Sequence, residues 1–273
     1  MNNKDNAVAL ITGTSSGIGL VTAKTLRQAG YRVFGTSRRE VASTDGITML
    51  TCDVTDEASV NSTVGEVLKQ AGRIDLMVNN AGMGLLGGAE ESSTAQAQAQ
   101  ALYDVNVFGI TRVTNAVLPT MRNQRKGRIV NVSSVLGLIP SPYNALYAAT
   151  KHAVEGYSES LDHELRTFGI RVVIVEPGFT RTSFEESLTR PDQPLAVYDS
   201  VRAGMAALMR NEVNAGDAPE VVANTVVKAA TTVAPRRRYV AGKQTSQVLF
   251  LRRFLPEALV DKSLRKFNQL PIV

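Results

Sequence analysis

The chain has 273 residues, of which 44% are hydrophobic and 20% charged, and its formal net charge is +5 at pH 7. Its one cysteine, Cys52, excludes an intramolecular disulfide and a multi-cysteine zinc site, and its two histidines argue against a histidine-based metal centre. The first residues contain no apolar signal segment, and no run reaches the roughly 18 apolar residues that a membrane-spanning helix needs. We therefore expect a cytoplasmic protein without metal chemistry, long enough for one large α/β core or two small domains.

Residues 7–11 are wholly apolar, which predicts a strand buried on both faces. A glycine-rich turn and a helical pattern follow, so backbone N–H groups and the positive end of a helix dipole meet where no Cβ obstructs a pyrophosphate. The spacing Gly-x-x-x-Gly-x-Gly differs from the dinucleotide fingerprint Gly-x-Gly-x-x-Gly, and a plain tight connection is the alternative. The candidate contacts of the turn are Gly13, Ser15, Ser16, Gly17, Ile18 and Gly19.

A second predicted strand, residues 32–36, leads into Ser37, Arg38 and Arg39. An acidic residue at this strand end would bind the adenosine ribose, whereas an arginine accommodates a 2′-phosphate. Because the acid is missing, the sequence favours NADP(H) over NAD(H), with Arg38 as the main contact and Ser37 in support. The alternative is a pair of solvated arginines in a polar loop.

A third predicted strand, residues 47–51, delivers Asp53 and Val54 as candidates for the adenine end of the site. Asp53 either accepts a hydrogen bond from the adenine amino group or caps the helix that starts near Asp56. The sequence favours neither role over the other. A fourth strand, residues 74–78, is followed by two asparagines and two small residues at its carboxyl end, where parallel sheets bind ligands. The candidates there are Asn79, Ala81 and Gly82, and the apolar residues 83–88 would wall a pocket.

Residues 95–121 have a long helical pattern with Asn106 in its middle. Asparagine competes for backbone hydrogen bonds and is usually avoided inside helices. An inward-facing Asn106 would need a reason, such as opening the helix to hold a water, and a surface position is the alternative.

A fifth predicted strand, residues 127–132, ends near Ser134, and the helical segment 144–168 brings Tyr147 close to it. Tyr147 and Lys151 are four residues apart, so their polar groups leave the helix on one face. A free phenol titrates near pH ~10, and a neighbouring ammonium is expected to move it towards the working range. Taken alone, such a pair is more often a core tyrosine beside a solvated lysine.

A sixth predicted strand, residues 171–175, runs into a Pro-Gly turn whose threonine hydroxyls can bind a carboxamide such as that of nicotinamide. The candidates are Pro177, Gly178, Thr180 and Thr182. Residues 183–201 are poorly periodic and long enough for a substrate lid. Residues 220–232 predict a final helix and residues 238–241 a seventh strand.

The positive charge is concentrated at the end of the chain, where residues 235–273 contain nine Lys or Arg against two acidic residues. The same stretch contains Val248, Leu249, Phe250, Leu251, Phe254 and Leu255. We interpret it as a packed terminal segment; the alternatives are a cover over the substrate and contact with an anionic membrane surface or a partner. Nucleic acid is not expected, because no recognition motif accompanies the charge.

Together, these motifs have the order and approximate spacing of the classical short-chain dehydrogenases/reductases, which the chain resembles over about residues 7–240. The matching motifs are Thr12-Gly13-x-x-x-Gly17-x-Gly19, Asn79-Asn80-Ala81-Gly82, Asn106, Ser134, Tyr147-x-x-x-Lys151 and Pro177-Gly178. The loop at 83–88 and the apolar C-terminus are similar to the 17β-hydroxysteroid and retinol dehydrogenase branch.

The resemblance implies one doubly wound Rossmann domain over residues 1–273, with a seven-stranded parallel sheet, helices on both faces and a C-terminal extension at about 242–273. The positions that match the catalytic tetrad are Asn106, Ser134, Tyr147 and Lys151, and Gly13, Gly17, Gly19, Asn79 and Thr182 match cofactor contacts. One departure is Ser16, where some NADP-dependent members carry a basic residue. The 2′-phosphate would then depend on Arg38 and Arg39 alone.

The expected reaction is hydride transfer between NADP(H) and a hydrophobic secondary alcohol or ketone, such as a steroid, a retinoid or a lipid-like carbonyl. Ser134 and Tyr147 would hold the carbonyl oxygen, and Tyr147 would donate the proton. Lys151 would lower the phenol pKa and bind the nicotinamide ribose, while Asn106 would hold a relay water. The apolar residues expected around the mouth are Met83, Leu85, Leu86, Leu138, Ile139, Tyr143, Phe179 and Phe184.

Two other functions use the same motifs. An NADP(H) sensor without turnover would need the glycine turn and Arg38, but not Ser134 with Tyr147. An epimerase or dehydratase of the related extended branch shares the Tyr-Lys pair, but its usual glycine spacing is Gly-x-x-Gly-x-x-Gly. By resemblance we also expect a homodimer or homotetramer that pairs through the helices at 95–121 and 144–168.

Overall fold

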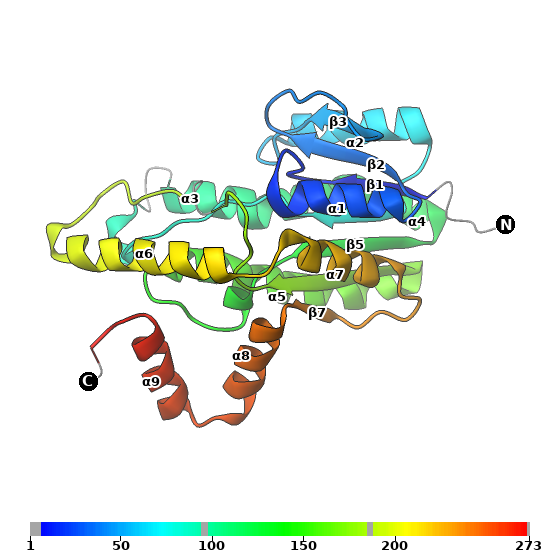
Figure 1. Cartoon of the computed structure of the whole chain (residues 1–273). Helices are drawn as coiled ribbons and strands as arrows, with labels where there is room; N and C mark the ends of the chain where they lie inside the picture. The colour runs from blue at the N-terminus through cyan, green and yellow to red at the C-terminus, as the bar shows by residue number, and fades with distance from the viewer. Residues whose placement is uncertain (1–6, 94–97, 185–187, 272–273) are drawn as a thin grey trace.

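The computed structural model describes residues 7–93, 98–184 and 188–271, and its centre is a seven-stranded, all-parallel sheet (Figure 1). The strand order is β3-β2-β1-β4-β5-β6-β7. The strands are β1 (Val8–Ile11), β2 (Arg32–Ser37), β3 (Ile47–Thr51), β4 (Leu76–Asn79), β5 (Gly127–Val132), β6 (Ile170–Pro177) and β7 (Arg238–Ala241). This confirms the predicted fold class.

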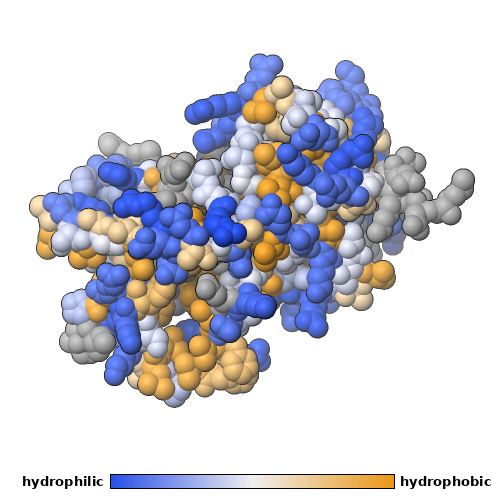
Figure 2. Space-filling view, viewed as in Figure 1, coloured by the Kyte–Doolittle hydropathy of each residue, from blue (hydrophilic) through white to orange (hydrophobic). Residues whose placement is uncertain are grey.

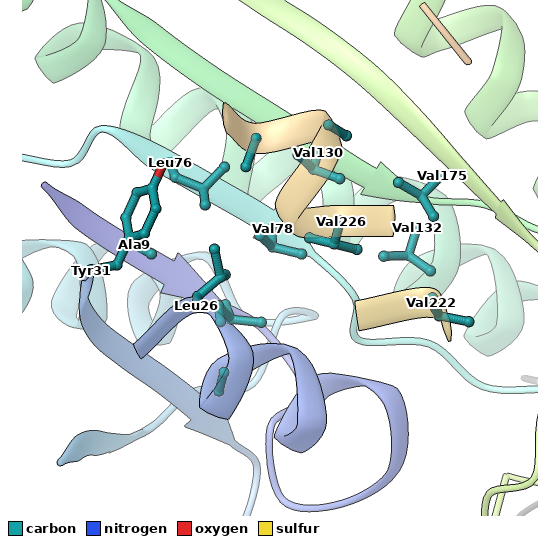
Figure 3. Packing of buried hydrophobic residues seen from close by; sticks show 14 of the residues in the cluster. Ala9, Leu26, Tyr31, Leu76, Val78, Val130, Val132, Val175, Val222 and Val226 are labelled. Carbon is teal, nitrogen blue, oxygen red and sulfur yellow. The ribbon is translucent and has the colours of Figure 1, made fainter. Parts of the chain in front are cut away.

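Helices cover both faces of the sheet because its strands are apolar on both sides. On one face, α1 (Gly17–Gln28) and α7 (Pro219–Thr231) pack on side chains such as Val78 and Val130, as Figure 3 shows. On the other face, α2 (Glu57–Ala71), α4 (Gly109–Gln124) and α5 (Ala145–Leu165) cover residues such as Leu10 and Ile129. The sheet is therefore rigid enough to fix the positions of the loops at its edges.

The order of the strands creates a crevice site between β1 and β4. From β1 the chain moves outward through β2 to β3, then returns to β4 on the other side of β1. The loops after β1 and β4 consequently diverge at their carboxyl ends, which is where open parallel sheets bind ligands. All of the predicted contact segments, from the glycine turn to the Pro-Gly turn, follow strands at this same edge.

Three helices lie where the sequence predicted none. The prediction that residues 220–232 form the last helix is wrong, because α8 (Lys243–Phe254) and α9 (Glu257–Phe267) follow β7. The helix α6 (Asp199–Ala215) precedes α7 and begins inside the expected lid. The helix α6 buries only Met205, and α9 buries no side chain although Val260, Leu264 and Phe267 recur at helical spacing.

The long helix expected at 95–121 is broken in two. Its first residues, 95–97, lie outside the described residues, and α3 (Gln98–Tyr103) is separated from α4 by a π-helical turn, Asp104–Phe108. The N–H of Gly109 donates to the carbonyl of Asp104, five residues earlier. Asn106 lies within this turn and is fully buried. The helix is thus opened at Asn106, as expected, because the backbone there forms a π turn in place of regular α-helical hydrogen bonds.

None of the helices that the structure describes is long and apolar enough to cross a membrane.

Candidate active site

Ser134 and Tyr147 come together at the carboxyl end of β5. Ser134 lies two residues beyond the strand, where its Oγ accepts a hydrogen bond from the Leu136 N–H at 3.2 Å. Tyr147 lies in the first turn of α5, and its phenol lies close enough to the Ser134 hydroxyl for that group to lower the pKa of the phenol. The loop of 134–147 therefore returns the chain as the sequence predicted, and two hydroxyls face one point.

Lys151 lies one turn further along α5 and is almost completely buried. Its Nζ donates to the carbonyl oxygen of Val132 at 3.0 Å and lies 5.7 Å from the centre of the Tyr147 ring. Burial lowers the pKa of Lys151 to about 8, although the charge of Glu155 opposes the shift. The ammonium is thus close to Tyr147 but bonded to the end of β5.

The expectation that Lys151 brings the pKa of Tyr147 towards neutrality is wrong for this geometry. Burial raises the pKa of Tyr147 to about 12, and the nearby Ser134 hydroxyl offsets only part of that increase. Desolvation prevails because it disfavours the phenolate, while Lys151 directs its protons to Val132 rather than to the phenol. Tyr147 therefore keeps its proton at neutral pH and is poised as an acid.

The side chain of Asn106 links two neighbouring segments of the chain. Its Oδ1 accepts from the N–H of Met83 at 2.9 Å, and its Nδ2 donates to the Met83 carbonyl at 2.9 Å and to the Thr150 hydroxyl at 3.2 Å. Thr150 in turn donates to the carbonyl of Tyr147 at 2.7 Å. Asn106 thus joins the loop after β4 to the first turn of α5, which positions Tyr147 and Lys151.

The glycine turn packs tightly against the loop after β4. A Cβ on Gly19 would lie 2.0 Å from the carbonyl oxygen of Gly13, and a Cβ on Gly13 would lie 2.9 Å from the Cα of Ala81. Gly13 and Gly17 also have positive φ angles of 70° and 56°. Larger residues are excluded at these positions, which keeps the N-terminus of α1 open at the crevice. No side chain caps this helix N-terminus, and Ser15 and Ser16 are exposed beside it while Ile18 is half-buried.

Asn79 ends β4 and Asn80 follows it, and their side chains have different partners. Asn79 is buried, and its Nδ2 donates to Asn131 at 2.8 Å inside the fold, so its carboxamide does not face the crevice. Asn80 instead donates to the carbonyl oxygens of Thr12 and Gly13, both at 3.0 Å. Adjacent residues of a strand point to opposite faces, and this alternation could have identified Asn80. Ala81 and Gly82 follow at the crevice, where Ala81 N–H donates to Thr12.

The residues predicted to contact the adenosine part of the cofactor lie at the carboxyl ends of β2 and β3. Arg38 is exposed directly after β2, and its charge contributes to lowering the pKa of Asp53, after the hydrogen bonds from Thr55. The capping alternative for Asp53 is wrong, because Asp56 caps α2 by accepting the Ala58 N–H. Asp53 instead accepts hydrogen bonds from the N–H and hydroxyl of Thr55. Ser37 and Val54 are buried beside them.

The loop after β6 closes over the glycine turn. Pro177 ends β6, and Thr180 is held by a β-bridge to Asp217. Thr182 lies against Gly17, because a Cβ built on Gly17 would be 3.4 Å from the Thr182 Cβ. A Cβ on Gly178 would collide with Thr245 of α8 at 2.2 Å. The Pro-Gly turn is thus fixed between the cofactor cradle and the C-terminal helices.

Apolar residues from two loops meet beside Tyr147. The ring of Phe184 lies 6.3 Å from that of Tyr147, and Gly84 lies directly beneath Phe184 and Leu188. Within the expected lid, residues 185–187 lie outside the described part, whereas Thr189 is bridged to Leu85 and Asp192 accepts from Ser93. The lid is therefore pinned to the 83–93 segment and gives the phenol an apolar neighbourhood.

A buried charge cluster lies behind Lys151. Arg238 of β7 forms ion pairs with Glu155 at 3.0 Å, Glu159 at 2.8 Å and Glu176 at 3.1 Å. Three carboxyl groups therefore share one guanidinium, and Glu155 and Glu176 are almost fully buried. Burial and the charge of Glu155 raise the pKa of Glu176 to about 8, against the opposing charge of Arg238. Glu176 consequently holds a proton at neutral pH.

This cluster predicts a stability that falls as the pH rises. Because the pKa of Glu176 is raised above the ~4.3 of an unfolded chain, its contribution is complete below pH ~4.3 and is lost as the pH rises through about 8. The Glu176→Gln variant should lose this dependence, so urea unfolding at pH 5.5 and pH 8 should give a smaller difference than for the wild type, by more than about 1 kcal/mol. Glu159→Gln is the comparison on the same arginine: because the charge of Glu159 is a smaller cause of the raised pKa of Glu176, this variant should reduce the difference less than Glu176→Gln does. An unchanged pH dependence in Glu176→Gln would show that this carboxyl is ionised in the fold.

Comparison with known proteins decides the family. A family model described as short chain dehydrogenase matches residues 7–193. The chain is a short-chain dehydrogenase/reductase. Among relatives of this family, the 3-ketodihydrosphingosine reductase of Bacteroides thetaiotaomicron is 37% identical over 267 residues, covering 95% of this chain and 97% of that protein. Retinol dehydrogenase 8 of Bos taurus is also 37% identical, over 84% of this chain and 80% of that protein.

Solved structures of the family agree with this assignment. A short-chain dehydrogenase from Streptomyces avermitilis superposes with a TM-score of 0.81 at 31% identity, covering 98% of both chains. A short-chain dehydrogenase/reductase from Burkholderia phymatum in complex with NAD has a TM-score of 0.81 at 26% identity, covering 93% of this chain and 95% of that one. ElxO with NADP bound has a TM-score of 0.71 at 27% identity, covering 86% and 97%. This short-chain dehydrogenase/reductase is therefore an oxidoreductase that uses a nicotinamide dinucleotide.

Proposed function

We propose that the protein transfers hydride between NADP(H) and a hydrophobic secondary alcohol or ketone, a reaction of the EC 1.1.1 type, with Tyr147 as general acid and base. The observation that carries the proposal is the close approach of the Ser134 and Tyr147 hydroxyls, with buried Lys151 one turn away. A sensor without turnover would have no use for this pair, and the related proteins described above lend that alternative no support. We further propose that the Rossmann fold forms one domain over the whole chain.

In the reduction direction, the Ser134 hydroxyl and the Tyr147 phenol hold the carbonyl oxygen of the substrate. NADPH, when bound, supplies the hydride that reduces the carbonyl carbon. The phenol of Tyr147 donates its proton to the oxygen, which balances the charge and releases the alcohol. A phenol whose pKa is about 12 holds that proton at neutral pH, as this step requires. Lys151, close to the phenol and positively charged below a pKa of about 8, stabilises the phenolate that remains.

The residues present fit a dinucleotide. The N-terminus of α1 faces the crevice without a side-chain cap, and Gly13, Gly17 and Gly19 keep Cβ atoms out of it. The other proposed contacts are Ser15, Ser16, Ile18, Ser37, Arg38, Asp53, Val54, Ala81, Gly82, Tyr147, Lys151, Pro177, Gly178, Thr180 and Thr182. Asn79 is left out because its side chain is bonded inside the fold.

The preference for NADP(H) rests on Arg38. Arg38 is exposed after β2 and no acidic residue ends that strand, so its guanidinium is free to pair with a 2′-phosphate. Arg38→Ala is expected to raise the KM for NADPH by about 10- to 100-fold and to leave the KM for NADH unchanged, since a hydrogen bond to a charged group contributes ~1.5–3 kcal/mol. Initial rates at the nicotinamide absorbance with each cofactor measure both constants.

Arg39→Ala is the matched control for this experiment, because Arg39 is the next exposed arginine and only its backbone N–H is bonded, to Ser37. It should raise the KM for NADPH less than Arg38→Ala. Equal losses for NADPH and NADH in Arg38→Ala would show that Arg38 is not at the phosphate.

A lipid-like carbonyl is the proposed substrate class. Tyr147 has Phe184 beside its ring, and Leu85 and Ile139 are buried nearby, so the reacting group enters an apolar surrounding. The relatives named for 3-ketodihydrosphingosine and retinol point in the same direction. Initial rates with NADPH and a panel of long-chain, steroidal, retinoid and short polar carbonyls test this class. Turnover of the short polar compounds alone would contradict it.

We also propose that the protein is a homodimer or homotetramer that pairs through α4 and α5. Phe108, in the π turn before α4, and Phe168, just beyond α5, are both exposed. The two rings lie at opposite ends of this pair of helices, and each is a large apolar side chain that contact with another copy would cover. Light scattering of the eluted protein measures the state directly, and a monomer would contradict the proposal.

A further inference from the structure

The helices α8 and α9 expose an unusual number of large apolar side chains. In Figure 1 they project from the α/β body at the end of the chain, and Figure 2 shows apolar residues gathered at that end of the molecule. Half of the large apolar side chains that are exposed in the described residues lie between positions 248 and 267. They are Val248, Phe250, Leu251, Phe254, Leu255, Leu259 and Phe267, and we call them the terminal apolar patch.

Phe250 and Phe254 form the most exposed part of this patch. Each is 64% exposed, and their rings lie 4.7 Å apart between centroids, tilted by 47°, on one side of α8. Two aromatic rings exposed to water do not contribute the favourable free energy that burial of their apolar surface would give. A surface of this kind marks an interaction site.

Cations surround the patch. The segment 243–267 contains six basic and two acidic residues, so it holds most of the net charge of the whole chain. In the part of the chain that the structure describes, Arg252, Arg253, Lys262 and Lys266 form no ion pair, and the Arg253 guanidinium lies 5.9 Å from the Phe254 ring. Unpaired cations beside exposed aromatic rings suit an anionic surface that also has an apolar layer.

The patch is adjacent to the candidate active site. The first turn of α8 touches the Pro-Gly turn through Thr245 and Gly178, and the end of α9 places Phe267 6.4 Å from Phe179, ring to ring. A groove of about 460 Å³ separates α9 from the start of α5 and is lined by residues such as Ala145 and Leu264. A surface that covers α8 and α9 would therefore lie beside the mouth of the site.

We propose that α8 and α9 form a docking surface for an anionic lipid bilayer, with Phe250 and Phe254 inserted at the level of the headgroups and the basic residues on lipid phosphates. The described helices are too short or too polar to span, so the contact is in the plane of the interface. A second copy on the same face would oppose equal positive charges across a two-fold axis, which disfavours that occupant. The proposal stands independently of the reaction proposed above.

Sedimentation of the full chain with vesicles tests this surface. Vesicles of phosphatidylcholine mixed in equal parts with phosphatidylglycerol should bind the protein at least tenfold more tightly than phosphatidylcholine alone, and added salt should weaken the binding. Phe250→Ser with Phe254→Ser should lower the partition coefficient on the mixed vesicles at least tenfold. Arg252→Gln with Arg253→Gln should do the same on mixed vesicles and leave the weak binding to neutral vesicles unchanged.

The chain offers matched controls outside the patch. Val233→Ser removes a fully exposed apolar side chain, and Arg236→Gln with Arg237→Gln removes two exposed positive charges before β7. Both should bind vesicles like the wild type, and all variants should keep the wild-type unfolding temperature. Equal binding to neutral and anionic vesicles, equal losses in the controls, or no binding by the wild type would overturn the proposal. Conversion of a dimer to a monomer by the two serines, without any vesicle binding, would assign the patch to a second copy instead.

Discussion

Replacing Tyr147 by phenylalanine is expected to lower kcat by roughly 10²- to 10⁴-fold, the usual contribution of a positioned general acid. The variant loses only the phenolic hydroxyl, which lies close to that of Ser134, and keeps the ring beside Phe184 and Lys151. NADPH affinity, measured by its fluorescence on binding, should change by less than about threefold, because the lost group acts on the carbonyl oxygen. Steady-state rates with a lipophilic ketone give kcat.

The matched control for this substitution is Tyr157→Phe. Tyr157 lies on the same helix, and its pKa is raised by burial, but its hydroxyl bonds to Thr114 and Thr111 on α4 rather than to Ser134. Its loss should leave kcat within about threefold of the wild type, since no reacting group is removed. Undiminished turnover in Tyr147→Phe would remove Tyr147 from the reaction.

Asp162→Asn is expected to destabilise the fold by about 3–5 kcal/mol, the cost of breaking a buried ion pair on one side. Asp162 is fully buried at the end of α5, where it accepts from Arg171 at 2.8 Å, from Val172 N–H at 3.0 Å and from Arg166. Burial alone would raise its pKa, but the hydrogen bonds from Arg171 and Arg166 prevail and lower the pKa to about 2. Asparagine fills the same space and leaves both arginines without their counter-charge.

The sign of the pH effect follows from that lowered pKa. The carboxylate stabilises the fold fully above the ~3.9 of an unfolded aspartate, and this contribution is lost as the pH falls through about 2. Urea unfolding at pH 7 should therefore show the whole loss, and the difference between the variant and the wild type should shrink under strongly acidic conditions. At neutral pH the unfolding temperature should fall by roughly 10 °C.

Asp45→Asn provides the control for this stability measurement. Asp45 pairs with Lys24 at 2.9 Å, but both side chains are about half exposed, so the pair contributes less than ~1 kcal/mol. A loss for Asp162→Asn no larger than that for Asp45→Asn would show that the junction of α5 and β6 does not depend on this carboxylate.

The sheet could be predicted from the sequence because its strands are short, continuous apolar runs. Segments such as 7–11 and 171–175 are buried on both faces and are therefore continuously apolar. Such a run can be recognised as a strand without knowing which strands or helices pack against it. The helix α8 gives no such signal, since its apolar residues are exposed and do not mark a core face. The break before α4 was indicated in the sequence by Asn106 alone, and the exact bounds of the π turn could not be predicted because they depend on the backbone hydrogen bonds.

The candidate site was predictable where it depends on local spacing. Tyr147 and Lys151 share a helix face at i and i+4, and Gly13, Gly17 and Gly19 lie in one turn between a strand and a helix. The roles of Asn79 and Asn106 depend on partners that are 23 or more residues away, such as Asn131 and Met83. The raised pKa of Tyr147 depends on burial by the whole fold, which no motif records.

The fate of a labelled hydride tests the central claim most directly. NADPH carrying deuterium at the transferred C4 position is incubated with the enzyme and a lipophilic ketone that it reduces, and the alcohol is analysed by mass spectrometry. We predict an alcohol with deuterium on the carbinol carbon, formed by the wild type and almost absent with Tyr147→Phe. An alcohol without the label, or equal product from both proteins, would contradict hydride transfer assisted by Ser134, Tyr147 and Lys151.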